Sequence, residues 1–135
     1  MGAGMCSTVA CPCGRMDGRR VRAFAHCCAP VLLDPSVAPD PEALMRSRYT
    51  AFVREDRDHL LATWHPSTRP AELNFEAGAK WLGLEVRHAA TPSPDAGEVE
   101  FVARCRVQGR ATRLHERSRF VRENGRWYYV NGDLS

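Results

Sequence analysis

Four cysteines near the start of the chain lie in two close pairs. Residues 11–14 read CPCG, and Cys27-Cys28 follows the spacer GRMDGRRVRAFAH. Two pairs of thiols joined by a short loop can surround one Zn²⁺, which takes four tetrahedral ligands in structural sites. The sequence therefore predicts a zinc ion bound by Cys11, Cys13, Cys27 and Cys28.

Other uses of these thiols stay open. Two disulfides are disfavoured in a reducing compartment, and a bond between the adjacent Cys27 and Cys28 would need a strained ring. Free structural thiols would leave the clustering unexplained. His26 or Cys6 could replace one cysteine ligand. Because four protein ligands close the coordination sphere, we expect a structural zinc rather than a catalytic one.

A second group of residues could form a pocket. Glu116 falls in an otherwise apolar strand row, where a carboxylate is costly unless it is paired. Arg48 and Tyr49 on the first long helix are its nearest partners by pattern, and Trp64 and His65 mark the end of the next helix. Glu116 could act as a general base in an isomerase or dehydratase, with Tyr49, His65 or Arg48 binding the oxyanion. Alternatively, Arg48 and Glu116 form an internal ion pair that catalyses nothing.

The sequence favours the ion pair, because one carboxylate in a strand pattern specifies no reaction and a fold does not fix a function. We therefore assign no catalytic residue. We expect either a protein partner or a small-molecule ligand.

The first half of the chain predicts helices that position these residues. Asp40 is a good N-cap and Pro41 suits a first helical turn, so a helix is expected over 41–53. A second helix is expected over 58–64, and a short one over 72–79. The three prolines of 31–41 predict a linker.

The second half predicts antiparallel strands. Period-two alternation occurs in four segments, 81–89, 98–107, 112–123 and 127–132. In the first segment, Leu82, Leu84 and Val86 are expected to share a face. Asn124-Gly125 predicts a type I′ hairpin that sets Phe120 across from Tyr129. Helices followed by a run of strands indicate an α+β fold.

Composition limits the choice of partners. The 135 residues fit one domain with a small appendage, and the net charge is +3. No apolar run could span a membrane and the first residues lack a secretory signal, so we expect no membrane and a cytoplasmic location. Arginine supplies almost all the positive charge, and Arg113, Arg117 and Arg119 share one strand face. Nucleic-acid binding by that face is a weaker alternative, since acidic residues are interleaved with the arginines.

These motifs resemble two known families. The cysteines match the C-x-C…C-[CH] order of the SEC-C motif, whose four positions bind zinc, although the spacer here is longer. The remainder resembles the YchJ-like family of uncharacterised bacterial proteins in PEALMRSRYTAFV (41–53), LLATWHPS (60–67), WLGL (81–84) and LHERSRFVRENGRWYYVNGD (114–133).

The resemblance implies a fold and a division of the chain. The fold would be a cystatin-like, nuclear transport factor 2-like (NTF2-like) α+β fold, with helices packed on a curved antiparallel sheet. The divisions would be a zinc module at 1–30, a linker at 31–41 and the α+β domain at 42–135. The zinc module could then serve as a docking surface or as a lid over a cavity.

Overall fold

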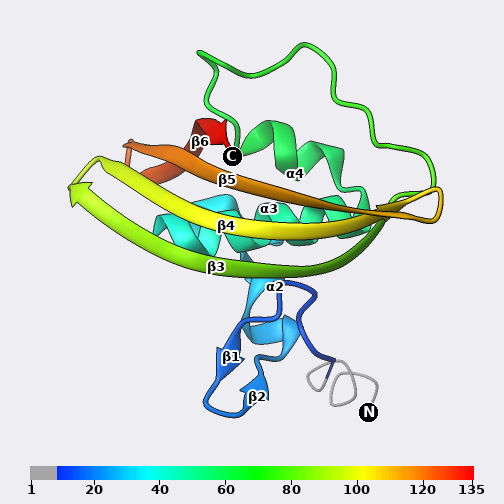
Figure 1. Cartoon of the computed structure of the whole chain (residues 1–135). Helices are drawn as coiled ribbons and strands as arrows, with labels where there is room; N and C mark the ends of the chain where they lie inside the picture. Colours follow the sequence, from blue (N-terminus) through cyan, green and yellow to red (C-terminus); the bar gives the residue numbers. More distant parts are fainter. Residues whose placement is uncertain (1–8) are drawn as a thin grey trace.

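A curved antiparallel sheet wraps one long helix in this computed structural model, which describes residues 9–135 (Figure 1). The sheet has the order β3-β4-β5-β6, and its strands are β3 (Lys80–Ser93), β4 (Ala96–Val107), β5 (Arg110–Glu123) and β6 (Arg126–Leu134). Helix α3 (Pro41–Arg54) packs on the inner side of the sheet beside the shorter α4 (Arg57–Ala62). The predicted α+β class is confirmed. No helix in the described part of the chain is long and apolar enough to cross a membrane.

Helix α3 begins where its capping residues predict. The Asp40 carboxylate accepts a hydrogen bond from the backbone N–H of Ala43 at 2.8 Å, and Pro41 occupies the first turn. The helix ends at Arg54, and the next residue, Glu55, adopts a left-handed conformation with φ of 55°. Helix α3 is 14 residues long, and one of its faces packs on the sheet while another is turned away from it.

The segment 72–79 is not a helix, contrary to the sequence prediction. Side-chain contacts fix this segment in an irregular conformation. Phe75 packs edge-on against Phe52, with 6.1 Å between the ring centres, and Arg57 donates a hydrogen bond to the carbonyl of Leu73. Gly78 has a φ of 74°, which a helix does not accommodate.

The Asn124-Gly125 turn is confirmed, with φ of 53° and 76° at its two residues. The register it imposes pairs Phe120 with Tyr129, as predicted. Gln108-Gly109 forms a turn with similar angles between β4 and β5, which the sequence prediction did not include.

The expected alternation along β3 is wrong at Leu82. A register irregularity between Trp81 and Gly83 leaves Leu82 44% exposed, whereas Trp81, Leu84 and Val86 pack against the core. An extra residue in one strand shifts the side chains on either side of it to different faces, so the period-two pattern is broken there.

The chain before α3 forms a small unit, which we call the cysteine module (residues 9–33). It contains the hairpin of β1 (Met16–Asp17) and β2 (Arg20–Val21), the 3₁₀ turn η1 (Phe24–His26) and helix α2 (Cys28–Leu33). The segment 31–41 is not a simple linker, because α2 continues to Leu33 and the 3₁₀ turn η2 (Pro35–Val37) follows. Val31 and Ala38 of this segment join the hydrophobic core.

Candidate functional site

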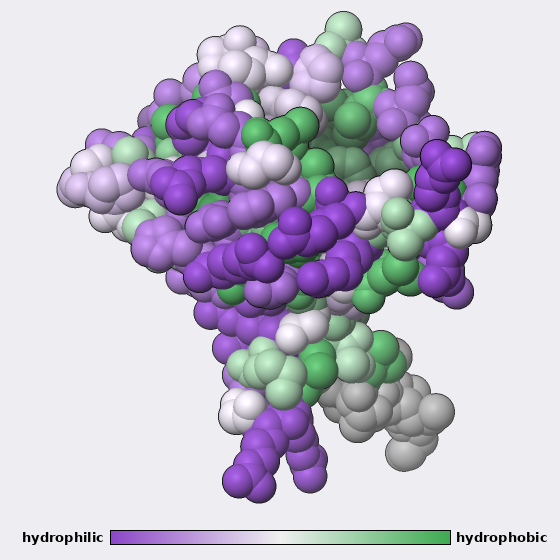
Figure 2. Space-filling model, viewed as in Figure 1, coloured by the Kyte–Doolittle hydropathy of each residue, from purple (hydrophilic) through white to green (hydrophobic). Residues whose placement is uncertain are grey.

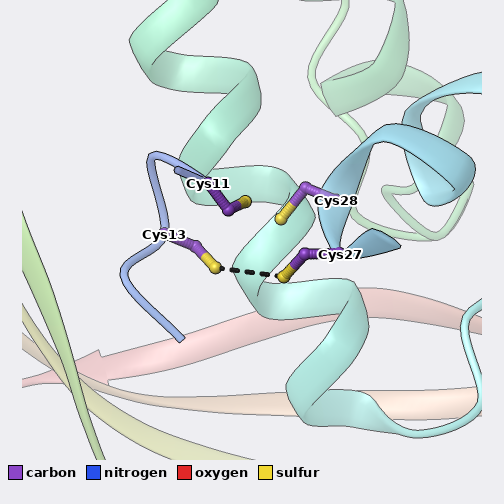
Figure 3. A group of neighbouring side chains, drawn as sticks. All are labelled: Cys11, Cys13, Cys27 and Cys28. Carbon is purple, nitrogen blue, oxygen red and sulfur yellow. Dashed lines mark hydrogen bonds between the residues drawn. The ribbon is translucent and has the colours of Figure 1, made fainter. Parts of the chain in front are cut away.

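The structure brings the four predicted cysteine ligands together (Figure 3). Cys11 and Cys13 come from the loop before β1, and Cys27 and Cys28 lie at the start of α2. Their sulfur atoms all lie within 4.8 Å of one another. Cys13 Sγ and Cys27 Sγ are 3.6 Å apart, and all four thiols are free.

Tetrahedral zinc fits this arrangement. With Zn–S bonds of ~2.3 Å, the sulfur–sulfur edges of a tetrahedron are about 3.8 Å, so only small side-chain movements are needed. Cys11, Cys13 and Cys28 are buried, which keeps water away from most of the cluster.

The ionisation of the thiols is mutually dependent. Hydrogen bonding with Cys13 and Cys28 lowers the pKa of the Cys11 thiol, whereas burial raises the pKa of Cys27. The pKa of Cys28 is also raised, first by its hydrogen bond with Cys11. The cluster therefore favours a thiolate at Cys11 and protonated thiols at Cys27 and Cys28, and four thiolates together would need a cation between them.

Helix α3 supplies polar groups around the cysteines. Arg46 Nη1 donates to the Cys13 carbonyl at 3.2 Å and lies 3.9 Å from Cys13 Sγ. Thr50 Oγ1 lies 4.0 Å from Cys11 Sγ. Groups of this kind orient metal ligands and offset the negative charge of a thiolate cluster.

The other candidate ligands do not join the cluster. His26 is exposed and lies outside the group of four sulfurs. Cys6 falls outside the described residues. Cys105 is buried on β4, as expected for a core thiol, and borders a cavity in the part of the chain from α3 onward, which we call the sheet domain (residues 41–135).

A cavity of about 290 Å³ lies between α3 and the inner face of the sheet. Arg48, Tyr49, Trp64 and Glu116, four of the five predicted pocket residues, line it. The rest of the lining is mostly aromatic or aliphatic: Met45, Phe52, Trp81, Phe101, Ala103, Leu114, Ser118, Phe120 and Tyr129. Figure 2 shows hydrophobic residues in a hollow beneath the long loop that follows α4.

His65, the fifth predicted pocket residue, does not line this cavity. Its Nε2 lies 2.8 Å from Glu123 Oε2, and its Nδ1 lies 2.7 Å from Ser67 Oγ. Its backbone N–H donates to the carbonyl of Tyr129, so the residue fastens the chain after α4 to β6.

The predicted ion pair between Arg48 and Glu116 is wrong. Arg48 Nη1 donates to the Leu60 carbonyl at 2.9 Å and to Thr63 Oγ1 at 2.7 Å. The guanidinium carbon lies 4.4 Å from the ring centre of Tyr129. Arg48 forms its hydrogen bonds with the C-terminal end of α4 rather than with Glu116 on the sheet, and this direction was not evident from its position on the helix.

Glu116 instead pairs with neutral groups of the sheet. Its Oε2 accepts hydrogen bonds from Ser118 Oγ at 2.6 Å and Tyr129 Oη at 3.1 Å. Tyr129 was missing from the sequence-predicted pocket. The Asn124-Gly125 turn could have revealed it, since that turn places Tyr129 opposite Phe120 on the face that carries Glu116.

The cysteine module is not a lid over this cavity, as the sequence analysis had suggested it could be. No described residue before Pro41 lines the cavity. The reason is the geometry of α3, which directs Met45, Arg48 and Phe52 toward the cavity and Arg46 and Thr50 toward the cysteines. The two candidate sites thus lie on opposite sides of one helix.

Two of the three arginines predicted to share a strand face, Arg117 and Arg119, lie beside acidic residues. Arg117 lies within 4.0 Å of Glu98 and Glu100, and Arg119 pairs with Asp133. The surface in this region is therefore charged but mixed in sign.

Comparison with known proteins extends these observations. A family model described as the YchJ middle NTF2-like domain matches residues 40–132. A UPF0225 protein from Polaromonas naphthalenivorans is 59% identical over 133 residues, covering 93% of this chain and 98% of that protein.

Two solved structures share the fold. The solution structure of a SEC-C motif containing protein from Rhodopseudomonas palustris superposes with a TM-score of 0.81 at 33% identity, covering 94% of this chain and 99% of that one. The crystal structure of a SEC-C motif containing protein from Psychrobacter arcticus has a TM-score of 0.74 at 27% identity, covering 97% and 85%. The NTF2-like fold and the SEC-C resemblance predicted from the sequence are confirmed, and the chain belongs to the family defined by the YchJ middle NTF2-like domain.

Proposed function

We propose that the chain binds one Zn²⁺ through Cys11, Cys13, Cys27 and Cys28, and that this ion is structural. The observation that carries the proposal is the convergence of four sulfurs within 4.8 Å. Thiolates are soft ligands that suit zinc, and the solved relatives contain the SEC-C motif. Four thiolates would leave no coordination position for a substrate or water.

The zinc would fasten the cysteine module to α3. The module is too small to bury a core of its own, and below about 40 residues a chain usually needs a metal, disulfides or a partner. Its buried cysteines instead continue the core that α3 and the sheet form. Arg46 would offset part of the charge of the zinc–thiolate cluster through its contact with Cys13. A cytoplasmic location would keep the thiols reduced and available for the metal.

Metal analysis of the purified chain under reducing conditions tests this proposal. We expect one zinc per chain in the wild type and almost none after Cys13→Ser, because Cys13 is fully buried in the cluster. Cys105→Ser is the matched control, since it removes a buried thiol elsewhere and should keep the zinc. A metal-free wild type with an ordered module would overturn the proposal, as would full zinc occupancy in Cys13→Ser.

The two alternative functions have less support and stay predictions. For an enzyme, the Glu116 carboxylate is bonded by Ser118 and Tyr129 rather than by Tyr49 or His65. For nucleic-acid binding, Arg117 and Arg119 of this strand face already have acidic neighbours.

A further inference from the structure

The inner cavity of the sheet domain has the properties of a small-molecule site. Its volume of about 290 Å³ is at the lower end of the ~300–1,000 Å³ typical of ligand pockets. A second cavity of about 320 Å³ adjoins it beneath residues 74–79, and four residues line both: Phe52, Trp81, Ala103 and Leu114. A ligand in the inner cavity would contact mainly aromatic and aliphatic side chains.

Arg48 is the exceptional group in this apolar lining. The residue is only 5% exposed. Among the residues that the structure describes, no carboxylate lies within ion-pair distance of it. Its direct contacts are neutral: the Leu60 carbonyl, the Thr63 hydroxyl and the rings of Trp64 and Tyr129, whose centres lie 5.0 and 4.4 Å from the guanidinium carbon. The Glu116 carboxylate acts on this charge only from beyond contact distance. A buried charge without a counter-ion is costly, and enclosed charges are normally paired.

The free part of the guanidinium borders the cavity. Nη1 makes both hydrogen bonds to the end of α4, while Nε and Nη2 have no hydrogen-bond partner within the described chain. These two atoms are not among the enclosed unpartnered polar atoms, and Arg48 lines the cavity. Burial lowers the pKa of Arg48 to about 10, so the group stays charged at neutral pH. Two adjacent N–H donors of a guanidinium match the two oxygens of a carboxylate.

Glu116 limits which anions would fit. Both of its protein hydrogen bonds reach Oε2, so Oε1 has no hydrogen-bond partner in the described chain, and Glu116 lines the cavity. A second negative group on the ligand would be repelled by this carboxylate. The protein environment is therefore complementary to a single anionic group at Arg48 and an apolar body against the aromatic side chains.

We propose that the cavity binds a small, largely apolar monocarboxylate, with its carboxylate on the free Nε and Nη2 edge of Arg48. The ring or aliphatic chain of the ligand would lie against Trp81, Phe101 and Leu114. This site is separate from the zinc cluster and does not depend on the zinc proposal.

Titration with three matched probes tests the inference: phenylacetate, its neutral amide phenylacetamide, and the cation phenethylamine. Binding is followed by isothermal calorimetry, and NMR shifts of the cavity residues locate it. We expect phenylacetate to bind the wild type at least about tenfold more tightly than phenylacetamide, because only the carboxylate can make a charge-assisted bidentate contact with Arg48. Phenethylamine should bind most weakly.

Variants separate recognition by Arg48 from a structural role. Arg48→Met keeps a side chain of similar length and should abolish the preference for the carboxylate over the amide. Ala103→Leu fills the cavity while retaining Arg48, and should weaken both probes together. Arg87→Met on β3, outside the cavity, is the control and should leave both affinities unchanged.

Three results would overturn the inference. Equal affinity of the wild type for phenylacetate and phenylacetamide would remove Arg48 as the recognition group. A preference for phenethylamine would assign that role to Glu116. Absence of binding for all three probes at millimolar concentration would mean that the cavity is not a site for this class of ligand. Because these comparisons use the wild type, they hold even if Arg48→Met does not fold.

Discussion

Different interactions stabilise the cysteine module and the sheet domain. In the module, three of the four cysteines that could bind a metal, Cys11, Cys13 and Cys28, are also part of the buried core. In the sheet domain, apolar side chains such as Leu44, Val99 and Phe120 are almost fully buried and form the core. Packing there leaves Arg48 and Glu116 beside the same cavity without a direct ion pair between them. The cysteines would therefore both stabilise the module and bind its metal, whereas in the sheet domain the two polar candidate binding groups, Arg48 and Glu116, are distinct from the apolar residues of the core.

Metal removal should produce the largest difference between the two regions. After treatment with a strong chelator under reducing conditions, we expect the amides of residues 9–33 to lose protection from hydrogen exchange. Strands β3–β6 should keep most of theirs, because the backbone ladder of the sheet involves no metal ligand and most of the core side chains around the buried cysteines come from α3 and the sheet itself. Hydrogen-exchange mass spectrometry measures both at once. Equal loss of protection in the sheet would mean that the two regions unfold as one unit.

A steric change in the sheet domain should destabilise that domain and leave the zinc content of the cysteine module unchanged. A Cβ atom at Gly97 would lie 2.2 Å from Pro41 Cγ and 3.3 Å from Trp127. Gly97→Ala should therefore force α3 away from β4 and cost roughly 1–3 kcal/mol of unfolding free energy. Urea denaturation measures this cost, with the exposed Ser93→Ala on β3 as control. Zinc content should stay at the wild-type level, and a loss of zinc would show that the module depends on the position of the α3 N-terminus.

The features that could be predicted from sequence depend on short stretches of chain. Asp40 caps α3 through a group three residues away, and Asn124-Gly125 sets its turn through its own backbone angles. The cysteine cluster is similar, since CPCG and Cys27-Cys28 are separated by one short hairpin. In each case residue type and spacing contain most of the information.

The features that could not be predicted depend on contacts between residues far apart in the sequence. Arg48 could have reached Glu116 or the end of α4, and only the packing of α4 beside α3 decides between them. The bulge at Leu82 depends on the pairing of β3 with β4. The conformation of the segment 72–79 is determined by its contacts with Phe52 and Arg57 rather than by its own helical preference.

His59 makes the sheet domain sensitive to mild acid. Its Nε2 lies 2.9 Å from Ser47 Oγ, whose hydroxyl donates to the Leu44 carbonyl, so Nε2 carries the proton and donates to Ser47. Burial lowers the pKa of His59 to about 4, whereas an unfolded histidine has a pKa of ~6.5. Between these values the unfolded chain binds more protons, so stability must fall as the pH decreases through this window.

The expected loss from His59 at pH 5 is about 2 kcal/mol relative to neutral pH. It is measured as the change in unfolding free energy between pH 7.5 and pH 5 in urea. His59→Gln should remove this part of the pH dependence, while His88→Gln, at an exposed position, should retain it. Comparing the variants at each pH cancels any acid-induced loss of zinc that they share. An unchanged pH dependence in His59→Gln would contradict the assignment.

Arg46 joins the two regions and should give the smallest effect. Its Nε donates to Glu42 at 2.8 Å, which fixes the side chain on α3, and its Nη1 contacts Cys13. Arg46→Gln should lower zinc affinity by roughly 10-fold, because groups that support metal ligands contribute about 10–100-fold. A competition titration with a chromogenic chelator measures this, with Arg119→Gln on the outer face of β5 as a control of equal charge change. If the cysteines alone determine zinc affinity, both variants will bind zinc as tightly as the wild type. The contact between Arg46 and Cys13 would then position the module on α3 without affecting its affinity for zinc.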